Sequence, residues 1–166
     1  MQPHFITLPR LLVVGVPYFG EPSQGEFAQV WTRLEPLLPL IPNQKPAGPG
    51  LPPVFYGVES YGADMAASGR WFYLAGVEVA NLDDVPVQVV AKIVPARQYA
   101  VFPYQGLLPG QVGELFQYAY KEWLPKSGYE QAGPFDLERY DHRFKGGQNP
   151  ESVTEICIPV DKLPFK

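Results

Sequence analysis

The sequence predicts an α+β fold made of two successive βαββ units. Residues 11–80 read strand, helix, strand, strand, and residues 98–160 repeat that order. Short strings also match in order, such as residues 55–59 in the first unit and 137–140 in the second. A period of about 80 to 90 residues indicates a duplication rather than a solenoid. We therefore expect pseudo-two-fold symmetry, antiparallel sheets and a central groove at the junction, where ligands commonly bind.

Two segments have helical periodicity. The first begins at Ser23 and is ended or kinked by Pro36. The second runs from 111 to 124 and stops at Pro125 and Gly128. The remaining apolar segments alternate or are bounded by Gly, Pro or Asp, which predicts strands at 11–17, 54–60, 70–80, 90–102, 135–142 and 153–160.

A loop is predicted at residues 42–53, which read PNQKPAGPGLPP and have no apolar periodicity. The segment before this loop is too short to fold alone, so the loop does not separate two domains. We expect one domain over residues 1–166, with repeats at about 10–90 and 91–162.

The composition is that of a globular domain, with 46% hydrophobic and 14% aromatic residues in a chain of 166. A net charge of −4 argues against direct nucleic-acid binding. One Cys and two His exclude a disulfide framework and a Cys/His zinc cage, and we expect no cofactor. No apolar run approaches about 18 residues, so no membrane span is expected. Residues 1–4 do not begin a signal peptide, which favours the cytoplasm.

Glu155 is the leading candidate site residue, because it lies in the middle of a predicted strand. Side chains alternate along a strand, so Ile156 and Ile158 share one face while Glu155 and Cys157 share the other. We expect the isoleucine face to pack under a helix and Glu155 to face the groove. There it would attract a cation, or act as a proton donor or acceptor. The alternative is a solvated Glu on an open sheet face, which periodicity alone favours.

Two further carboxylates and two tyrosines are weaker candidates. Glu78 lies in the strand that corresponds to that of Glu155, although nearby polar residues suggest a wet strand end. Glu59 is a third carboxylate. Tyr140 shares a strand face with Glu138 and could stack on a ligand or assist proton transfer, unless it is an ordinary sheet tyrosine. Tyr56 is its counterpart in the first repeat.

Aromatic residues near these carboxylates could complete a cation site, because a ring face attracts a positive charge. Two of the candidates lie in the predicted helices, where anchoring the core is the favoured role, and two lie in strands. These four residues are Trp31, Trp123, Trp71 and Phe102.

The single thiol, Cys157, lies two residues from Glu155. A nucleophilic Cys needs an activating base, and no His is close in sequence. His142 follows Tyr140 by two residues, which leaves a Cys157–His142 pair open. Buried Cys is usually inert, so we do not favour catalysis by Cys157. We expect His4 to lie exposed in an N-terminal tail.

The ordered motifs resemble those of the GyrI-like effector-binding domain, also found at the C-terminus of AraC-type and multidrug-binding transcription regulators. The resemblance covers residues 10 to 162. The second half reads YAVFPYQG (99–106), EWLPKSGY (122–129), FDLERYD (135–141) and TEICIPV (154–160). The first half reads LVVGV (12–16), FAQVW (27–31), YGVES (56–60) and YLAGVEV (73–79).

This resemblance implies a tandem βαββ fold whose groove takes flat, hydrophobic, often cationic molecules. It also implies a ligand-facing Glu at the position of Glu155 and favours a pocket role for Tyr140. Few residues precede the first predicted strand, so the chain is similar to stand-alone members. Some of these hydrolyse cyclopropane-bearing compounds, and the founding member binds DNA gyrase.

Three hypotheses follow. The first is a cytoplasmic protein that binds a hydrophobic, cationic aromatic molecule. The second is a hydrolase of reactive cyclopropane compounds, in which Glu155 and Tyr140 are catalytic. The third is a protein-interaction role such as gyrase inhibition. It is the least favoured, because the negative charge of the chain is weak and dispersed. The oligomeric state is not specified by the sequence.

Overall fold

The structure is a computed structural model that describes residues 2–21 and 26–164. Its elements, in chain order, are β1 (His4–Leu8), β2 (Leu11–Gly20), α1 (Glu26–Leu34), η1 (Glu35–Leu40), β3 (Phe55–Ser60), α2 (Met65–Ser68), β4 (Trp71–Glu78), β5 (Val90–Val94), β6 (Arg97–Gln105), α3 (Val112–Tyr118), η2 (Ala119–Trp123), η3 (Leu124–Lys126), β7 (Tyr129–Gln131), β8 (Phe135–Tyr140) and β9 (Val153–Lys162).

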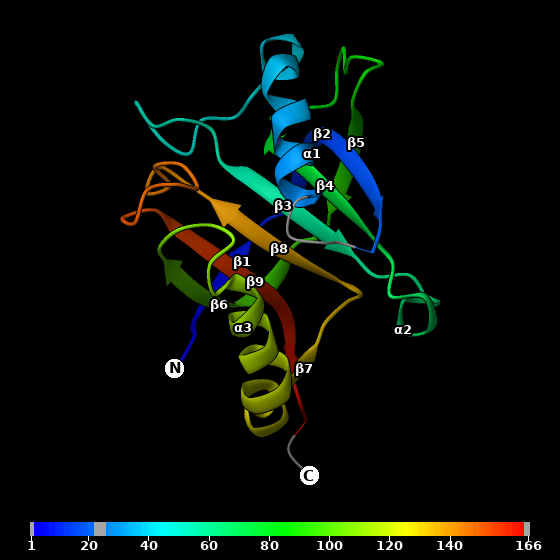
Figure 1. Ribbon diagram of the computed structural model, residues 1–166, viewed down its shortest axis with the longest axis vertical. Helices are drawn as coiled ribbons and strands as arrows, with labels where there is room; N and C mark the ends of the chain where they lie inside the picture. Colours follow the sequence, from blue (N-terminus) through cyan, green and yellow to red (C-terminus); the bar gives the residue numbers. More distant parts are fainter. Residues whose placement is uncertain (1, 22–25, 165–166) are drawn as a thin grey trace.

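The nine strands of the described residues join one antiparallel sheet, which confirms the predicted α+β class (Figure 1). The main path has the order β1-β6-β9-β8-β3-β4-β2-β5, and β7 pairs with β9 outside it. In this order β6-β9-β8 mirrors β2-β4-β3 about the central β3–β8 pair. The two central strands therefore come from the two predicted halves, as expected for a junction. The repeat boundary near residue 90 stays a prediction.

The edge strands are exchanged between the halves. β1 precedes β2 in the chain but pairs with β6, and β5 precedes β6 but pairs with β2. Each half thus supplies the outermost strand of the other. His4 lies in β1, so the expectation that it belongs to an N-terminal tail is wrong. The side chain of His4 is exposed, as predicted.

The predicted strand at 90–102 is two strands, β5 and β6. The break falls at Pro95 and Ala96, and proline has no N–H to donate to a sheet. The sequence interpretation also missed β7. The other predicted strands match β2, β3, β4, β8 and β9 to within a few residues.

The first predicted helix is α1, and Ser23 lies outside the described residues. The α-helix ends at Leu34, as expected from Pro36, and the chain continues as the 3₁₀ helix η1, whose first turn tolerates a proline. The second helix also changes form along its length, from α3 through the π turn η2 to the 3₁₀ turn η3. Both helical units therefore continue for a few residues beyond their predicted ends, to Leu40 and to Lys126.

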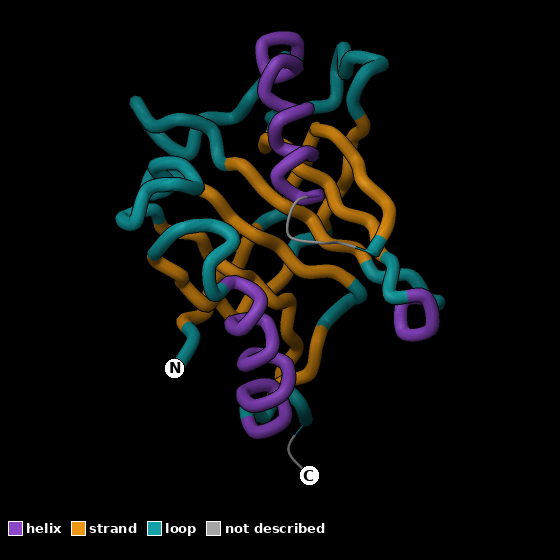
Figure 2. Tube along the Cα trace, viewed as in Figure 1, coloured by secondary structure: helices purple, strands orange, loops and turns teal. Residues whose placement is uncertain are grey.

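The two main helical units cover the same face of the sheet at different places (Figures 1 and 2). α1 packs on β2 and β4, whereas α3 packs on β6 and β9. The central strands β3 and β8 lie between them. Each helix thus covers the outer part of its own half and leaves the junction strands free on this face.

The opposite face of the sheet carries a closed hydrophobic core. This core includes residues from β2 and β5 at one end of the sheet and from β6 at the other, so the sheet curls around it. Its fully buried members include Val13, Val58, Val94, Val101, Leu137 and Cys157.

The predicted loop at 42–53 has no regular strand or helix, but it is tied to the sheet by a bridge between Gln44 and Val79. Within the described residues, none of the helices has the length and apolar character needed to span a membrane.

Candidate functional site

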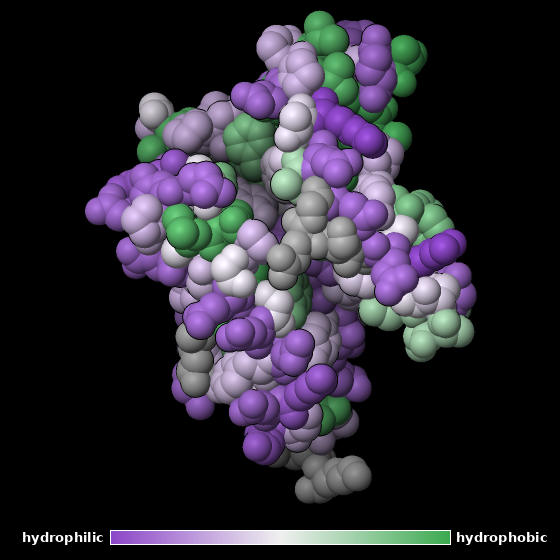
Figure 3. Space-filling model, viewed as in Figure 1, coloured by the Kyte–Doolittle hydropathy of each residue, from purple (hydrophilic) through white to green (hydrophobic). Residues whose placement is uncertain are grey.

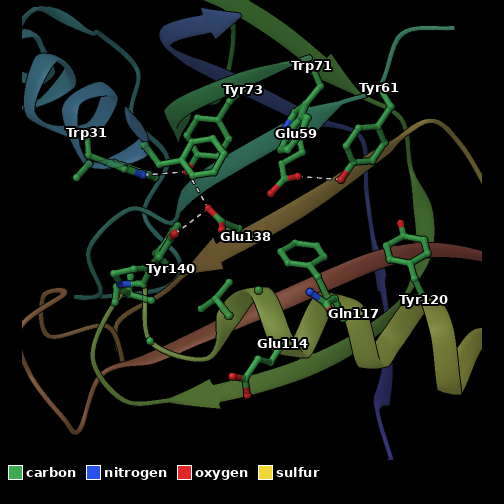
Figure 4. Close-up of a pocket in the computed structure, with 18 of the residues that line it drawn as sticks. Trp31, Glu59, Tyr61, Trp71, Tyr73, Glu114, Gln117, Tyr120, Glu138 and Tyr140 are labelled. Atoms are coloured by element: carbon green, nitrogen blue, oxygen red, sulfur yellow. Dashed lines mark hydrogen bonds between the residues drawn. The ribbon is translucent and has the colours of Figure 1, made fainter. Parts of the chain in front are cut away.

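A large pocket of about 1550 Å³ lies between α1 and α3, above the central strands β3 and β8. On this face, hydrophobic residues gather where the loop before α3 lies (Figure 3). Aromatic side chains form much of the pocket wall (Figure 4). The described lining includes Phe27, Trp31, Phe55, Glu59, Tyr61, Trp71, Tyr73, Phe116, Gln117, Tyr120, Glu138, Tyr140 and Phe144.

Strand alternation decides which central side chains reach the pocket. On β8, Glu138 and Tyr140 line it, while Leu137, which precedes Glu138, belongs to the core on the opposite face. On β3, Phe55 and Glu59 line it in the same way. The pocket therefore has a carboxylate on each central strand, and Figure 4 shows the two near its centre.

Glu138 is held by two phenols. Tyr73 donates a hydrogen bond of 2.7 Å and Tyr140 one of 2.9 Å, both to Glu138 Oε2. The indole of Trp31 donates in turn to Tyr73 Oη at 2.9 Å. Burial raises the pKa of Glu138, and the two phenol hydrogen bonds partly oppose that rise. Because both phenols donate to one oxygen, the arrangement suits the ionised carboxylate.

Gly57 makes this arrangement possible. It lies directly opposite Glu138 in the β3–β8 pair. A Cβ atom at this position would collide with Tyr73 Oη and Glu138 Oε2. A residue without a side chain is therefore needed beneath the Tyr73–Glu138 hydrogen bond.

A second acidic cluster lies beside the first. Glu59 and Asp136 are direct partners in the β3–β8 register. Tyr61 Oη lies 2.8 Å from Glu59 Oε2 and 2.8 Å from Asp136 Oδ2. Tyr120 donates to Asp136 at 2.6 Å and accepts a hydrogen bond from Gln131 at 2.7 Å. The phenol of Tyr61 thus joins the two carboxyl groups.

Both carboxyl groups of this cluster are shifted toward the protonated form. Burial raises the pKa of Asp136 to about 6, even though Tyr120 and Tyr61 hydrogen bonds favour its ionised form. Burial, followed by the charges of Glu138 and Asp136, raises the pKa of Glu59 well above its ordinary value. Glu59 is therefore the group most disposed to hold a proton.

The described part of the pocket wall carries no positive charge to compensate these acids. None of the described lining residues is Lys, Arg or His. The aromatic rings surround the acids closely, with Trp31 edge-on to Tyr140 at 5.1 Å and Phe27 against Tyr73 at 4.3 Å between centroids. Buried carboxylates and ring faces without a basic partner form a site suited to an organic cation. No group of His, Cys, Asp and Glu suited to a metal ion occurs among the described residues.

The expectation that Glu155 faces the groove is wrong. Its side chain is 5% exposed and forms ion pairs with Arg139 at 2.6 Å and Arg143 at 2.7 Å. The alternation was predicted correctly, since Ile156 and Ile158 pack with α3. The error is in the position of the groove, which lies on the helix-bearing face and not on the face away from the helices.

Glu155 and Tyr140 therefore do not form the predicted catalytic pair, because Tyr140 lines the pocket and Glu155 does not. Cys157 is fully buried in the core, and burial raises the pKa of its thiol. His142 contacts Asp141 at 4.0 Å. These positions give Cys157 no activating base among the described residues.

Four other predicted residues also lie outside the pocket. Glu78 pairs with Lys45 of the 42–53 loop at 2.7 Å, so it anchors that loop. Tyr56 points into the core on the opposite face, because it alternates with the pocket residues of β3. Phe102 and Trp123 pack against each other in the core beneath α3, with a centroid distance of 5.3 Å.

Tyr140, Trp31, Trp71 and the weaker candidate Glu59 do line the pocket. Their roles in binding stay predictions. Glu138 was not among the predicted site residues, although it was expected on the same strand face as Tyr140. The alternation in FDLERYD was therefore the available signal. Tyr61, Tyr73 and Tyr120 had no comparable signal, because their hydrogen bonds depend on tertiary contacts between distant segments.

Comparisons with known proteins agree on one family. The model of the GyrI-like small molecule binding domain matches residues 1–161. The transcriptional regulator BrlR of Pseudomonas aeruginosa is 34% identical over 160 residues, which is 96% of this chain and 56% of BrlR. The chain thus spans little more than half the length of this relative.

Solved structures show the same fold. SAV2435 bound to tetraphenylphosphonium has a TM-score of 0.74 at 20% identity, covering 97% of this chain and 94% of that one. EcmrR in a complex with DNA has a TM-score of 0.72 at 13% identity, covering 98% of this chain and 58% of that one.

Replacing Glu155 should affect stability rather than the pocket. In Glu155→Gln, Arg139 and Arg143 lose one of two counter-charges, because Asp141 still pairs with both of them. We expect the free energy of unfolding to fall by about 2 kcal/mol, less than for a fully enclosed pair because Arg143 stays partly exposed. Urea unfolding measures this change. An unchanged midpoint would show that these ion pairs contribute nothing to stability.

Gly57→Ala should disturb the Tyr73–Glu138 hydrogen bond and lower the free energy of unfolding by about 1–3 kcal/mol. Gly113→Ala is the matched control, since a Cβ there meets open space in a helix. The control should be neutral or more stable by up to about 1 kcal/mol. Equal losses in the two variants would contradict the steric argument.

The pKa of Asp136 is raised to about 6, so the folded state binds this proton more tightly than the unfolded state. The stability that results is fully present below about pH 4 and is lost as the pH rises through about 6. Asp136→Asn cannot ionise. It should therefore lose less stability than the wild type between about pH 4 and 7 in urea unfolding. Parallel pH profiles would argue against a raised pKa.

Proposed function

Because the chain belongs to the GyrI-like family of small-molecule-binding domains, we propose that its pocket binds a hydrophobic aromatic cation. Glu138 supplies the counter-charge in this proposal. The observation that carries it is a buried carboxylate held only by phenols, in a pocket whose described lining has no basic residue. A positive ligand would provide the charge that the protein does not.

The aromatic wall favours a ligand with rings. Trp31, Tyr73 and Tyr140 surround Glu138, so a cation near its free oxygen also meets ring faces. Each such contact contributes about 0.5 to 2 kcal/mol, depending on how far water is excluded. The pocket of about 1550 Å³ also exceeds the range of about 300 to 1,000 Å³ common for small-molecule sites. It has room for a bulky cation, and the similar protein SAV2435 holds tetraphenylphosphonium.

The wider role follows from the relatives. BrlR is a transcriptional regulator, and EcmrR forms a complex with DNA. We propose that this domain senses a ligand and makes no direct DNA contact, since its net charge is −4 and its pocket is acidic. A cytoplasmic location stays a prediction.

Titration with tetraphenylphosphonium tests the proposal. Wild-type protein should bind it, and Glu138→Gln should weaken binding by about 10- to 100-fold, because the cation loses its counter-charge. Calorimetry or quenching of tryptophan fluorescence measures the dissociation constant. A neutral compound with the same phenyl groups should bind the wild type more weakly than the cation.

Glu35→Gln is the matched control, because it removes the same charge at an exposed position outside the pocket. It should bind the cation as the wild type does. If Glu138→Gln also bound with unchanged affinity while remaining folded, Glu138 could not be the counter-charge.

A further inference from the structure

The number of protons in the Glu59–Tyr61–Asp136 cluster can be deduced from its contacts. Tyr61 has one phenol proton but lies 2.8 Å from an oxygen of each carboxyl group. It can donate to only one of them. The second short oxygen–oxygen contact therefore needs a proton supplied by a carboxyl group.

The surroundings place that proton on Glu59. Asp136 already accepts from Tyr120, whose own oxygen is used by Gln131. If Tyr61 also donates to Asp136, this carboxylate has two donors and suits the ionised form. Among the described residues, Tyr61 is the hydrogen-bond partner of Glu59, so the proton that the second contact needs lies on Glu59 and points to Tyr61 Oη. The charges of Glu138 and Asp136 also favour a proton on Glu59, because they raise the pKa of its carboxyl group.

We propose that a cation entering the pocket displaces this proton, so that Glu59 becomes a second counter-charge and ligand binding is coupled to proton release. This inference rests on the proposed function. Glu59 and Glu138 are diagonal neighbours on β3 and β8, and both line the pocket. A positive charge between them offsets the repulsion that holds the proton on Glu59. The balance is simple: one cation enters, and one proton passes from the Glu59 carboxyl to water.

Among the described residues that line the pocket around Glu59, none has a basic side chain that could take part in this exchange. The titratable groups that face Glu59 from the packed elements are Tyr61 after β3, Tyr73 of β4, Asp136, Glu138 and Tyr140 of β8, and Tyr120 of η2. The tyrosines stay neutral because burial raises the pKa of each phenol.

Calorimetry of tetraphenylphosphonium binding in two buffers of different ionisation enthalpy, at one pH, counts the protons released. Wild-type protein should release up to one proton per cation. Its affinity should rise with pH, by at most about tenfold per pH unit. Glu59→Gln keeps Glu138 as counter-charge, so it should still bind but release no proton. Glu35→Gln should behave as the wild type.

Tyr61→Phe gives a second, independent readout. Tyr61→Phe removes the phenol oxygen that Glu59 shares with Asp136, so the pH range of proton release should differ from that of the wild type while binding persists. Binding without proton release in the wild type, or equal release in Glu59→Gln, would overturn the inference. Absence of binding in the wild type would instead overturn the proposed function, so the two failures are distinct.

Discussion

Acidic side chains without basic partners are the constraint on which this pocket depends. Burying a carboxylate is costly unless it is hydrogen-bonded or protonated. Glu138 and Asp136 follow the first route, because phenols donate hydrogen bonds to them. Glu59 follows the second, because it shares the single phenol proton of Tyr61 with Asp136. The hydrogen bonding of Glu138 also constrains the sheet beneath it, because residue Gly57 must lack a side chain for Tyr73 to reach Glu138. The tyrosine content of the chain is therefore tied to charge burial as well as to packing.

The position of the pocket follows from the duplicated architecture. Each half has one main helical unit, and each unit packs over its own outer strands. The junction strands β3 and β8 are consequently covered by neither, although their other face is buried in a shared core. Exchange of the edge strands β1 and β5 ties the halves together around this core. A stable sheet can thus leave its centre open to a ligand.

The strand and helix order could be predicted from periodicity, because hydrophobic alternation and helical spacing are local signals. The strand-internal alternation around Glu155 was also predicted correctly. The sequence does not indicate on which face of the sheet the groove lies, because both faces of the central strands carry polar as well as apolar residues. The groove was expected on the face that carries Glu155, and Glu155 was therefore predicted as the site carboxylate in place of Glu138. β1 was missed because its partner, β6, is distant in sequence.

Strand β8 shows how charge distinguishes the two faces once the structure is known. Its Asp136 and Glu138 lie on the pocket side, whereas Arg139 between Glu138 and Tyr140 turns to the other side and pairs with Glu155. The acid on the closed face is thus neutralised within the protein, by Arg139 and Arg143. The acids on the open face have only phenols. A buried acid that already has two arginines offers little to a cation, whereas one without any attracts it. Partner chemistry therefore identifies the binding face where alternation alone does not.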